Sequence, residues 1–273
     1  MDESNRYTDS THLEHYERNG VVCLRQVLSK TEIESLRAGI EQNLRELSHR
    51  AKIASRPDDP GHFVEDFCTW QNNPHYREVI FNSALGKIAA HLTQSERVRL
   101  YHDHLLVKEP GTRQPTPWHQ DQPYYNIAGR QNCSFWIPVD PIKRASSLEF
   151  VTGSHHGPWL MPRTFMDNQA KWFPEGELTE LPDINADRTK FPIVSFEMEP
   201  GDVLCFHMLT LHAARGVDEE NRRRVFSVRF LGDDMVHAPR NWPTSPDFPG
   251  LADQLPKDAP LDHPLFPIVW EQK

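Results

Sequence analysis

The sequence predicts a mainly β protein, a jelly roll, with flanking helices. From residue 97 onward the chain is a series of short runs rich in valine, leucine, phenylalanine and tryptophan, separated by proline and glycine. Such runs are typical of an all-β sandwich or barrel. Helix-capping signals and helical spacing of apolar residues dominate residues 1–95 instead. We therefore expect one domain over residues 1–273, with a mainly helical part at 1–95, a jelly-roll core at 96–235 and a C-terminal tail at 236–273 that wraps the barrel without regular structure.

The first expected helix begins at a capping box. Thr11 and Glu14 are spaced so that a hydroxyl and a carboxylate satisfy each other's backbone N–H groups at a helix start. Gly20 is expected to end this helix, because glycine is the usual residue just past a helix end. The apolar residues 21–24 then predict a short strand.

A second capping box, Ser29 with Glu32, predicts a long amphipathic helix that ends near Arg50. The apolar residues that recur at helical spacing along it are Ile33, Leu36, Ile40, Leu44 and Leu47. Residues 65–92 predict two further helices, interrupted near residues 72–74 and 82–83 by turn-forming residues.

Six runs in the second half of the chain predict the strands of the jelly roll. They are residues 97–108, 133–139, 148–151, 193–198, 203–207 and 224–231. The interval 156–191 between two of these runs is long, polar and rich in proline, which indicates a lid or binding loop rather than a linker.

Charge and cysteine usage limit the partners and the compartment. The formal net charge is −9 and the pI is about 5.9, whereas nucleic acids and anionic membranes attract clustered positive charge. We therefore expect a small-molecule substrate, no nucleic acid and no membrane. The cysteines, which have no paired spacing and predict free thiols, are Cys23, Cys68, Cys133 and Cys205. With no signal peptide in the given sequence, the expected location is cytoplasmic.

The segment around His119 and Asp121 predicts a metal site. The two residues are two positions apart, so on a strand or at its end their side chains project to the same side. A second histidine from another strand would complete the two-histidine, one-carboxylate facial triad of non-haem Fe(II) oxygenases, which leaves coordination positions open for substrates. Taken alone, a His-x-Asp tripeptide more often belongs to ordinary β structure.

The distal histidine has two candidates, His207 and His212, near the end of the strand predicted at 203–207. An arginine-rich run that opens the next strand follows them. Alternation on that strand places Arg223, Val225, Ser227 and Arg229 on one side, and Arg222, Arg224 and Phe226 on the other, so that one arginine points inward. Such an arginine suits the distal carboxylate of 2-oxoglutarate, because guanidinium binds carboxylate in a bidentate manner.

Other histidines have more ordinary interpretations. His102 and His104 flank Asp103 on a predicted strand, and we expect them to make hydrogen bonds near the mouth of the barrel. His155 and His156 follow a glycine in a turn, where a structural or exposed role is expected.

The sequence resembles the phytanoyl-CoA dioxygenase family of 2-oxoglutarate oxygenases. The matching motifs are residues 15–22, the turn at 108–111, Trp118-His119-Gln120-Asp121, the turn at 152–155, and Gly201-Asp202 leading to His212 and Arg223. The resemblance implies a double-stranded β-helix, the cupin-like jelly roll. It also implies Fe(II) on His119, Asp121 and His212, and 2-oxoglutarate on Arg223, whose offset from the distal histidine favours His212 over His207.

The resemblance suggests further contacts and one departure. Trp136 and Lys108 fall where cosubstrate contacts are expected, although Trp136 also suits a core position and Lys108 a solvated strand end. Family members often carry Gly-Ser after the distal histidine, whereas this chain has Ala213-Ala214, so the serine contact is missing or replaced. The substrate-pocket candidates are Gln122, Tyr124 and Trp159.

The expected reaction consumes 2-oxoglutarate and O2, releases succinate and CO2, and hydroxylates an unactivated C–H bond of a small metabolite. Because Asp121 is present, no position is vacated for chloride and halogenation is disfavoured; desaturation and ring formation stay open. The alternatives are a Zn(II)- or Mn(II)-dependent isomerase or hydrolase on the same barrel, which needs no 2-oxoglutarate arginine, and a non-catalytic metabolite-binding barrel. Dependence on 2-oxoglutarate separates these three functions.

Overall fold

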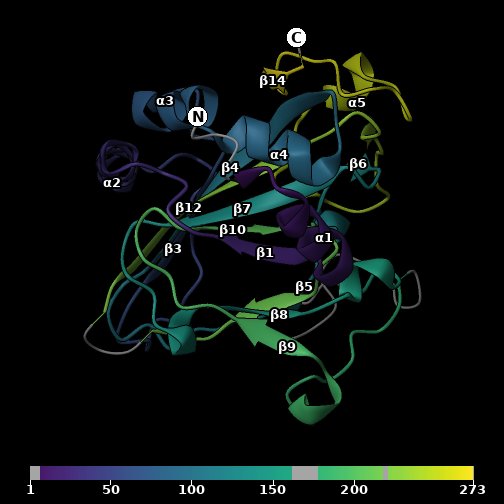
Figure 1. The fold of residues 1–273 in the computed structure, drawn as a ribbon. Helices are drawn as coiled ribbons and strands as arrows, with labels where there is room; N and C mark the ends of the chain where they lie inside the picture. The colour runs from purple at the N-terminus through teal and green to yellow at the C-terminus, as the bar shows by residue number, and fades with distance from the viewer. Residues whose placement is uncertain (1–6, 162–177, 218–220, 273) are drawn as a thin grey trace.

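Two antiparallel sheets face each other and form the body of the molecule (Figure 1). The computed structural model describes residues 7–161, 178–217 and 221–272. The larger sheet has eight strands, in the order β1 (Val21–Leu24), β10 (Val203–Phe206), β7 (Asn132–Pro138), β12 (Arg223–Leu231), β4 (Arg97–Lys108), β3 (Phe63–Phe67) and β2 (Lys52–Ile53), with β14 (Ile268–Glu271) paired to β4. The predicted jelly roll is confirmed.

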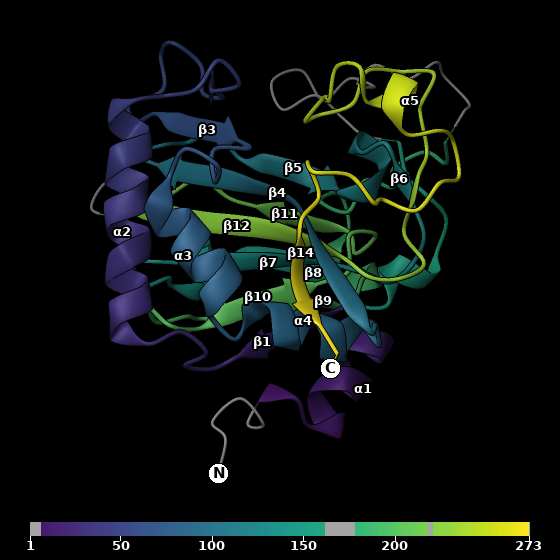
Figure 2. The same cartoon turned by 90° about the horizontal axis from the view of Figure 1, so that it is seen from above.

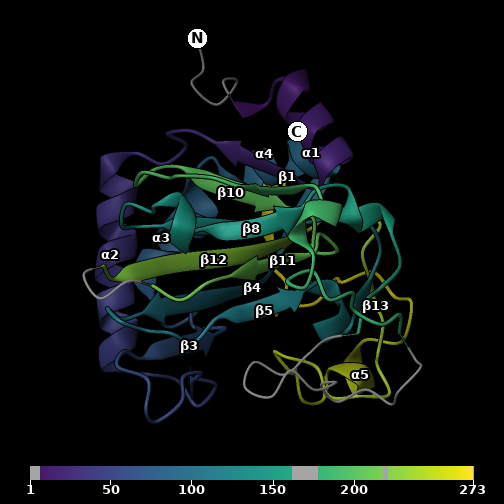
Figure 3. The same ribbon diagram turned by 90° about the horizontal axis from the view of Figure 1, so that it is seen from below.

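The smaller sheet lies across the interior from the larger one (Figure 3). Its order is β5 (Thr116–His119), β11 (His212–Ala214), β8 (Leu148–Val151) and β9 (Ile193–Ser195). No strand was predicted at β11, whereas His119, the last residue of β5, was predicted to lie on a strand or at its end. Both are short, and such short runs carry little periodicity.

Helices cover the outer face of the larger sheet, as Figure 2 shows from above. They are α2 (Lys30–Arg45), α3 (Pro74–Asn82) and α4 (Leu85–Thr93), while α1 (Ser10–Asn19) lies beside β1. The main hydrophobic core fills the space between these helices and the sheet. Leu36 of α2, Ile88 of α4 and Phe226 of β12 are all fully buried in it.

The helix boundaries test the capping predictions. Ser29 and Glu32 form the predicted capping box at the start of α2. The box predicted at Thr11 is wrong, because Asp9 caps α1 by accepting a hydrogen bond from the backbone N–H of His12. Gly20 ends α1 as predicted, with φ of 73°, and α2 ends at Arg45, before the predicted end near Arg50.

The ends of the chain contribute more strand than the sequence predicted. The N-terminal part supplies β1, the short strand predicted at residues 21–24, and also β2 and β3, which were not predicted, to the larger sheet in addition to its helices. The tail was expected to lack regular structure, which is wrong: β13 (Val236–His237) pairs with β6 (Ile127–Ala128), α5 (Leu251–Gln254) follows, and β14 pairs with β4. A strand that completes a sheet edge is stabilised by tertiary pairing, which local sequence does not report.

The predicted lid at 156–191 extends beyond the described residues, since 162–177 lie outside them. Its described ends pack on the smaller sheet, where Leu160 and Ile184 are buried against Trp118. The four cysteines are free thiols, as predicted. Among the described residues, no helix combines the length and the apolar character needed to cross a membrane.

Candidate metal centre and cosubstrate pocket

His119 and His212 face each other across two neighbouring strands of the smaller sheet. His119 is the last residue of β5, His212 is the first residue of β11, and the two are direct partners in the antiparallel register. Their ring centroids are 4.2 Å apart. Strand pairing therefore sets the distance between the two histidines.

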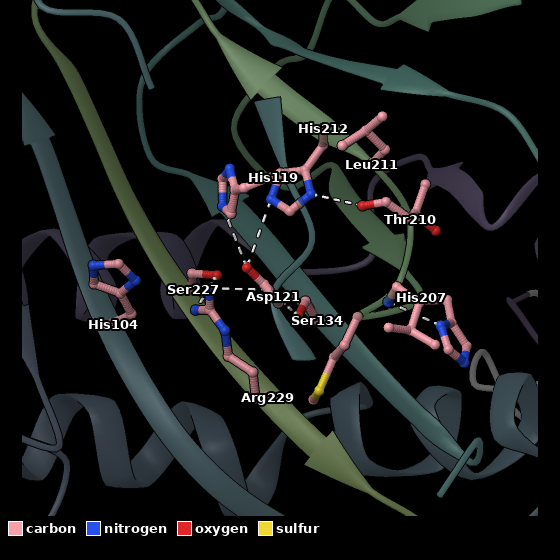
Figure 4. A network of polar contacts seen from close by, with 12 residues as sticks. His104, His119, Asp121, Ser134, His207, Thr210, Leu211, His212, Ser227 and Arg229 are labelled. Carbon is pink, nitrogen blue, oxygen red and sulfur yellow. Dashed lines mark hydrogen bonds and ion pairs between the residues drawn. The ribbon is translucent and has the colours of Figure 1, made fainter. Parts of the chain in front are cut away.

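Asp121 reaches the same point from just beyond the end of β5. Its backbone is helical, with φ of −71°, and it leads into a 3₁₀ turn at Gln122–Tyr124. Its N–H donates to the carbonyl of Met208 at 2.8 Å, which fixes the turn against the segment before β11. Oδ1 of Asp121 lies 3.5 Å from Nε2 of His119 and 3.7 Å from Nε2 of His212 (Figure 4).

Hydrogen bonds orient both imidazole rings. Nδ1 of His119 donates to the carbonyl of Pro117, and Nδ1 of His212 donates to the carbonyl of Thr210, each at 2.8 Å. With Nδ1 protonated, Nε2 carries the lone pair and points toward Asp121. Burial lowers the pKa of His212 to about 3, which keeps its ring neutral, as a metal ligand requires. Ligand atoms of the three residues all lie within 4.8 Å of one another.

The second oxygen of Asp121 is held by groups behind the triad. Oδ2 accepts a hydrogen bond from Ser134 Oγ at 2.7 Å and lies 3.4 Å from Arg229 Nη2. Burial alone raises the pKa of this carboxyl, but the opposing charge of Arg229 and the contact with His119 hold it well below the usual value. The carboxylate is thus ionised and its free oxygen faces the two histidines.

His207, the other candidate for the distal ligand, lies outside this group. Its Nε2 donates to the carbonyl of Arg130 at 2.9 Å, and its Nδ1 accepts from the N–H of Leu209 at 3.0 Å. Figure 4 shows its ring turned away from the triad. Both ring nitrogens are therefore occupied by backbone.

A pocket of about 510 Å³ between the two sheets contains the triad. Arg223 and Arg229 both face it from β12, so two arginines point inward, rather than the one that the sequence predicted. Arg222 and Arg224 face outward, and they pair with Glu41 of α2 at 2.9 Å. The alternation predicted for this strand is confirmed.

Arg223 is a buried cation that has no acidic partner among the described residues. Only 4% of the residue is exposed, and burial lowers the pKa of its guanidinium to about 10. It donates to the carbonyl of Ser146 and lies 5.8 Å from the ring of Trp136. Among the described residues, no carboxylate lies within ion-pair distance of it, and its Nε has no hydrogen-bond partner. A buried guanidinium of this kind is suited to an anionic ligand.

The remaining predicted site residues divide into two groups. Trp136 and Tyr124 line the pocket, and the ring of Tyr124 meets His119 edge-on at 5.9 Å. Lys108, Gln122 and Trp159 are not among its lining residues.

Each of these three residues has a contact elsewhere. Lys108 Nζ donates to the carbonyls of Gln114 and Arg215, at 2.7 and 3.0 Å. Gln122 donates to the carbonyl of Gly129, and Trp159 packs against Arg240.

Sequence reasoning assigned no role to three residues of the pocket. Arg229 was placed on the correct side of β12, but nothing in the sequence linked it to Asp121. Glu65 and Thr116 also line the pocket. The only signal for Thr116 is its place three residues before His119, while β3, which carries Glu65, was expected to be helical.

Comparison with known proteins agrees with this geometry. Residues 16–225 match the sequence profile of the family described as Phytanoyl-CoA dioxygenase (PhyH). The chain belongs to the phytanoyl-CoA dioxygenase family. A probable phytanoyl-CoA dioxygenase of Caenorhabditis elegans is 31% identical over 140 residues. That alignment covers 49% of this chain and 43% of the nematode protein, so the chain spans less than half of that relative.

Solved structures related to this phytanoyl-CoA dioxygenase family member share its fold over nearly the whole chain. SnoK, a non-haem alpha ketoglutarate dependent carbocyclase from nogalamycin biosynthesis, is 25% identical with a TM-score of 0.74, and 96% of each chain is covered. SnoN, an epimerase from the same pathway, is 20% identical with a TM-score of 0.75 and the same coverage. EctD from S. alaskensis, solved with 2-oxoglutarate and 5-hydroxyectoine, is 16% identical with a TM-score of 0.68, covering 89% of this chain and 82% of its own.

Proposed function

We propose that this protein is a non-haem Fe(II)- and 2-oxoglutarate-dependent oxygenase that hydroxylates an unactivated C–H bond of a small molecule. One oxygen atom of O2 enters the product and the other enters succinate, which is released with CO2. The observation that carries the proposal is Arg223, a buried guanidinium without an acidic partner among the described residues, facing the same pocket as the triad. A zinc hydrolase on this barrel would have no use for such a cation.

The residues present fit both absent groups. His119, Asp121 and His212 would hold Fe(II), because their Nε2 and carboxylate oxygens converge and the histidine Nδ1 atoms are already hydrogen-bonded. Arg223 would bind the distal carboxylate of 2-oxoglutarate. When bound, the iron supplies the activation of O2 that accompanies decarboxylation of the cosubstrate.

The protein's own residues position the reactants and exclude water. Trp136, Leu148 and Phe206 line the pocket with apolar surface, which strengthens the charge contact at Arg223. The serine that family members often carry after the distal histidine is alanine here. Thr116 lies opposite Ala214 in the β5–β11 register and lines the same pocket, so we infer that its hydroxyl replaces the serine contact to the cosubstrate.

The test is an anaerobic titration of Fe(II)-loaded protein with 2-oxoglutarate, followed by the visible metal-to-ligand charge-transfer band. We expect a band in the wild type, no band in His212→Ala, and a band in Arg223→Ala that needs far more 2-oxoglutarate. His207→Asn is the control: it keeps an acceptor for the N–H of Leu209, and its titration should match the wild type because His207 lies outside the triad. If iron-replete wild-type protein shows no band, this result contradicts the oxygenase proposal and favours another metal or a binding role.

A second outcome at the same site is ring formation. SnoK, which is described as a carbocyclase, aligns over 96% of this chain, so the same fold occurs in an enzyme whose description names ring formation. Product mass separates the two outcomes, because hydroxylation adds one oxygen atom and ring closure removes two hydrogen atoms.

A further inference from the structure

Lys52 of β2 belongs to the inner face of the larger sheet, where it lines the mouth of the pocket. Residues that lie opposite each other in an antiparallel sheet carry their side chains on the same face. Lys52 lies opposite Glu65 of β3, and Glu65 lies opposite Leu106 of β4. Leu106 in turn lies opposite Val225, on the inward side of β12. Lys52, Glu65 and Leu106 all line the pocket, as this register requires.

The ammonium group of Lys52 has no acidic partner among the described residues. Its Nζ lies 5.5 Å from the centre of the Phe67 ring, and Phe67 also lines the pocket. The carboxylate opposite it in the register, Glu65, is engaged by another residue, since its Oε1 lies 3.2 Å from Nε2 of His104. Lys52 is exposed. A ligand therefore reaches its ammonium group without displacing an ion pair.

Ser245 brings a second open polar group to the pocket from the C-terminal tail. Its N–H donates to the carbonyl of Tyr124 at 2.9 Å, which fixes this part of the tail beside the pocket. Ser245 lines the pocket and is half-buried, and its hydroxyl makes no hydrogen bond within the described part of the chain. Asp247, two residues later, pairs with Arg50 at 2.8 Å, and Arg50 is two residues before Lys52. This ion pair ties the two segments together at one rim.

The charges of the pocket favour an anionic substrate. Its lining residues include three cationic side chains, Lys52, Arg223 and Arg229, and two carboxylates, Asp121 and Glu65. Fe(II) and the dianion of 2-oxoglutarate carry opposite charges of equal size, so binding both leaves this excess of positive charge unchanged. Positive charge in one cleft of a chain with a formal net charge of −9 attracts anions to that cleft. With Arg223 assigned to the cosubstrate and Arg229 to Asp121, Lys52 is the lining cation that is left for a substrate.

The β3 and β4 side of the pocket also offers apolar surface, from Phe63, Phe67 and Leu106. Burying a hydrocarbon against this surface is favourable, whereas a carboxylate buried there would lose its hydration without gaining a partner. A substrate that keeps its carboxylate at the rim and directs its hydrocarbon body inward matches both kinds of surface.

We propose that Lys52 and Ser245 form a rim subsite that binds a carboxylate of the substrate. The ammonium group of Lys52 and the hydroxyl of Ser245 each donate a hydrogen bond to the carboxylate oxygens. This inference rests on the proposed oxygenase function and names the substrate class of the same pocket, a carboxylic acid with an apolar body.

The test compares carboxylates with their neutral amides on two skeletons. Protein saturated with Fe(II) and 2-oxoglutarate is titrated anaerobically, by calorimetry, with octanoate and octanamide, and with 2-naphthoate and 2-naphthamide. We expect the carboxylate of at least one pair to bind about tenfold more tightly than its amide, and this preference to shrink as the NaCl concentration rises. The charge-transfer band, recorded in parallel, should persist, which shows that the probe has not displaced 2-oxoglutarate.

Variants assign the preference to the two residues. Lys52→Met should reduce it to about threefold or less and remove most of its salt dependence, whereas Lys52→Arg should keep it. Ser245→Ala should weaken binding of the carboxylate by about two- to tenfold and that of the amide by less, because hydrogen bonds to charged groups are stronger. Two controls should match the wild type: Lys30→Met, which removes an exposed cation elsewhere, and Thr244→Ala, whose residue does not line the pocket.

The outcomes separate this inference from the proposed function. The charge-transfer band forms without any probe, so its absence would overturn the oxygenase itself. With the band present, the subsite is overturned if carboxylate and amide bind equally on both skeletons, if neither pair binds, if the carboxylates abolish the band, or if Lys52→Met keeps the wild-type preference. This last result would leave Lys52 only the role of protecting a sheet edge from pairing with another chain. Unchanged affinity in Ser245→Ala would overturn the part assigned to Ser245.

Discussion

Nη2 of Arg229 lies 3.4 Å from Oδ2 of Asp121, behind the carboxylate oxygen that faces the two histidines. The guanidinium is itself fixed by the hydroxyls of Tyr125 and Ser227, at 3.2 and 2.8 Å. All four groups are buried. Arg229 is therefore a positioning residue, which keeps Asp121 ionised and correctly oriented in a site that would otherwise favour its protonated form.

Replacing Arg229 should weaken the metal site. In Arg229→Met, burial alone would act on Asp121, its pKa would rise, and protons would compete with the metal. We expect Fe(II) or Co(II) affinity to fall by about 10- to 100-fold, with the larger loss at lower pH. Competition titration with a chelating dye measures this. Ser134→Ala, which removes one hydrogen bond from the same oxygen but no charge, should have a smaller effect, and equal metal affinity in Arg229→Met and wild type would contradict the role.

Arg223 should behave differently, because its partner is a ligand. We expect 2-oxoglutarate to raise the melting temperature of the metal-loaded wild type and to have no effect on Arg223→Met. Without ligand, Arg223→Met should melt close to the wild type. Losing the bond to Ser146 is offset by removing a buried charge that has no acidic partner in the described part of the chain.

Arg224→Met is the matched control on the same strand. Arg224 points outward and pairs with Asp140 at 2.6 Å, so its loss should lower the melting temperature but leave the 2-oxoglutarate shift intact. A normal shift in Arg223→Met would exclude the predicted cosubstrate contact.

His207 should make the fold sensitive to acid. Burial, followed by the nearby His155, lowers its pKa to about 3, from the ordinary histidine value of about 6.5. Between these values the unfolded chain binds one more proton than the folded one, so stability falls as pH drops from about 6.5 toward 3, by up to about 1.4 kcal/mol per pH unit. Above pH 6.5 the residue contributes no pH dependence. Protonating Nδ1 would also break the hydrogen bond from Leu209 that shapes the turn beside the triad.

Urea unfolding of the metal-free protein between pH 4.5 and 7.5 measures this effect, with chelator present so that metal release does not contribute. His207→Asn keeps an acceptor for Leu209 but cannot titrate, so its stability should fall less steeply with acid, by about one proton. His49→Asn replaces an exposed histidine as the control. An unchanged slope in His207→Asn would show that another group dominates.

The sequence predicted well those parts of the fold whose signal lies within a short stretch of neighbouring residues. The capping box at Ser29 and the strand Arg97–Lys108 were both found because a short window contains the whole signal. The sequence predicted that His119 and Asp121 would lie together because their spacing is local, and the structure places them beside His212. Alternation predicted which side of β12 faces inward.

The parts that sequence missed depend on residues distant in the chain. β14 forms because β4 has a free edge near Arg99, and β3 is a strand rather than a helix because it pairs with β4. The pairing of Glu65 with His104, and of Arg229 with Asp121, likewise arises only when strands become neighbours. No pattern in one sequence connects residues that are so far apart. In addition, strand pairing in the folded protein overrides a weak local preference for helix or coil.

Lys108 provides a test of one predicted contact that the geometry does not support directly. Its ammonium group is fully buried, donates to two backbone carbonyls in the segments that flank β5 and β11, and lies 4.7 Å from the ring of Phe63.

Lys108→Met fills the same space but leaves those carbonyls without a donor. We expect the free energy of unfolding to fall by about 1–3 kcal/mol, and the affinity for 2-oxoglutarate to change only a few-fold. Urea unfolding and the charge-transfer titration measure the two quantities separately. If Lys108 instead contacts the cosubstrate, as the family resemblance suggested, Lys108→Met will weaken 2-oxoglutarate binding as strongly as Arg223→Met does, whatever happens to stability.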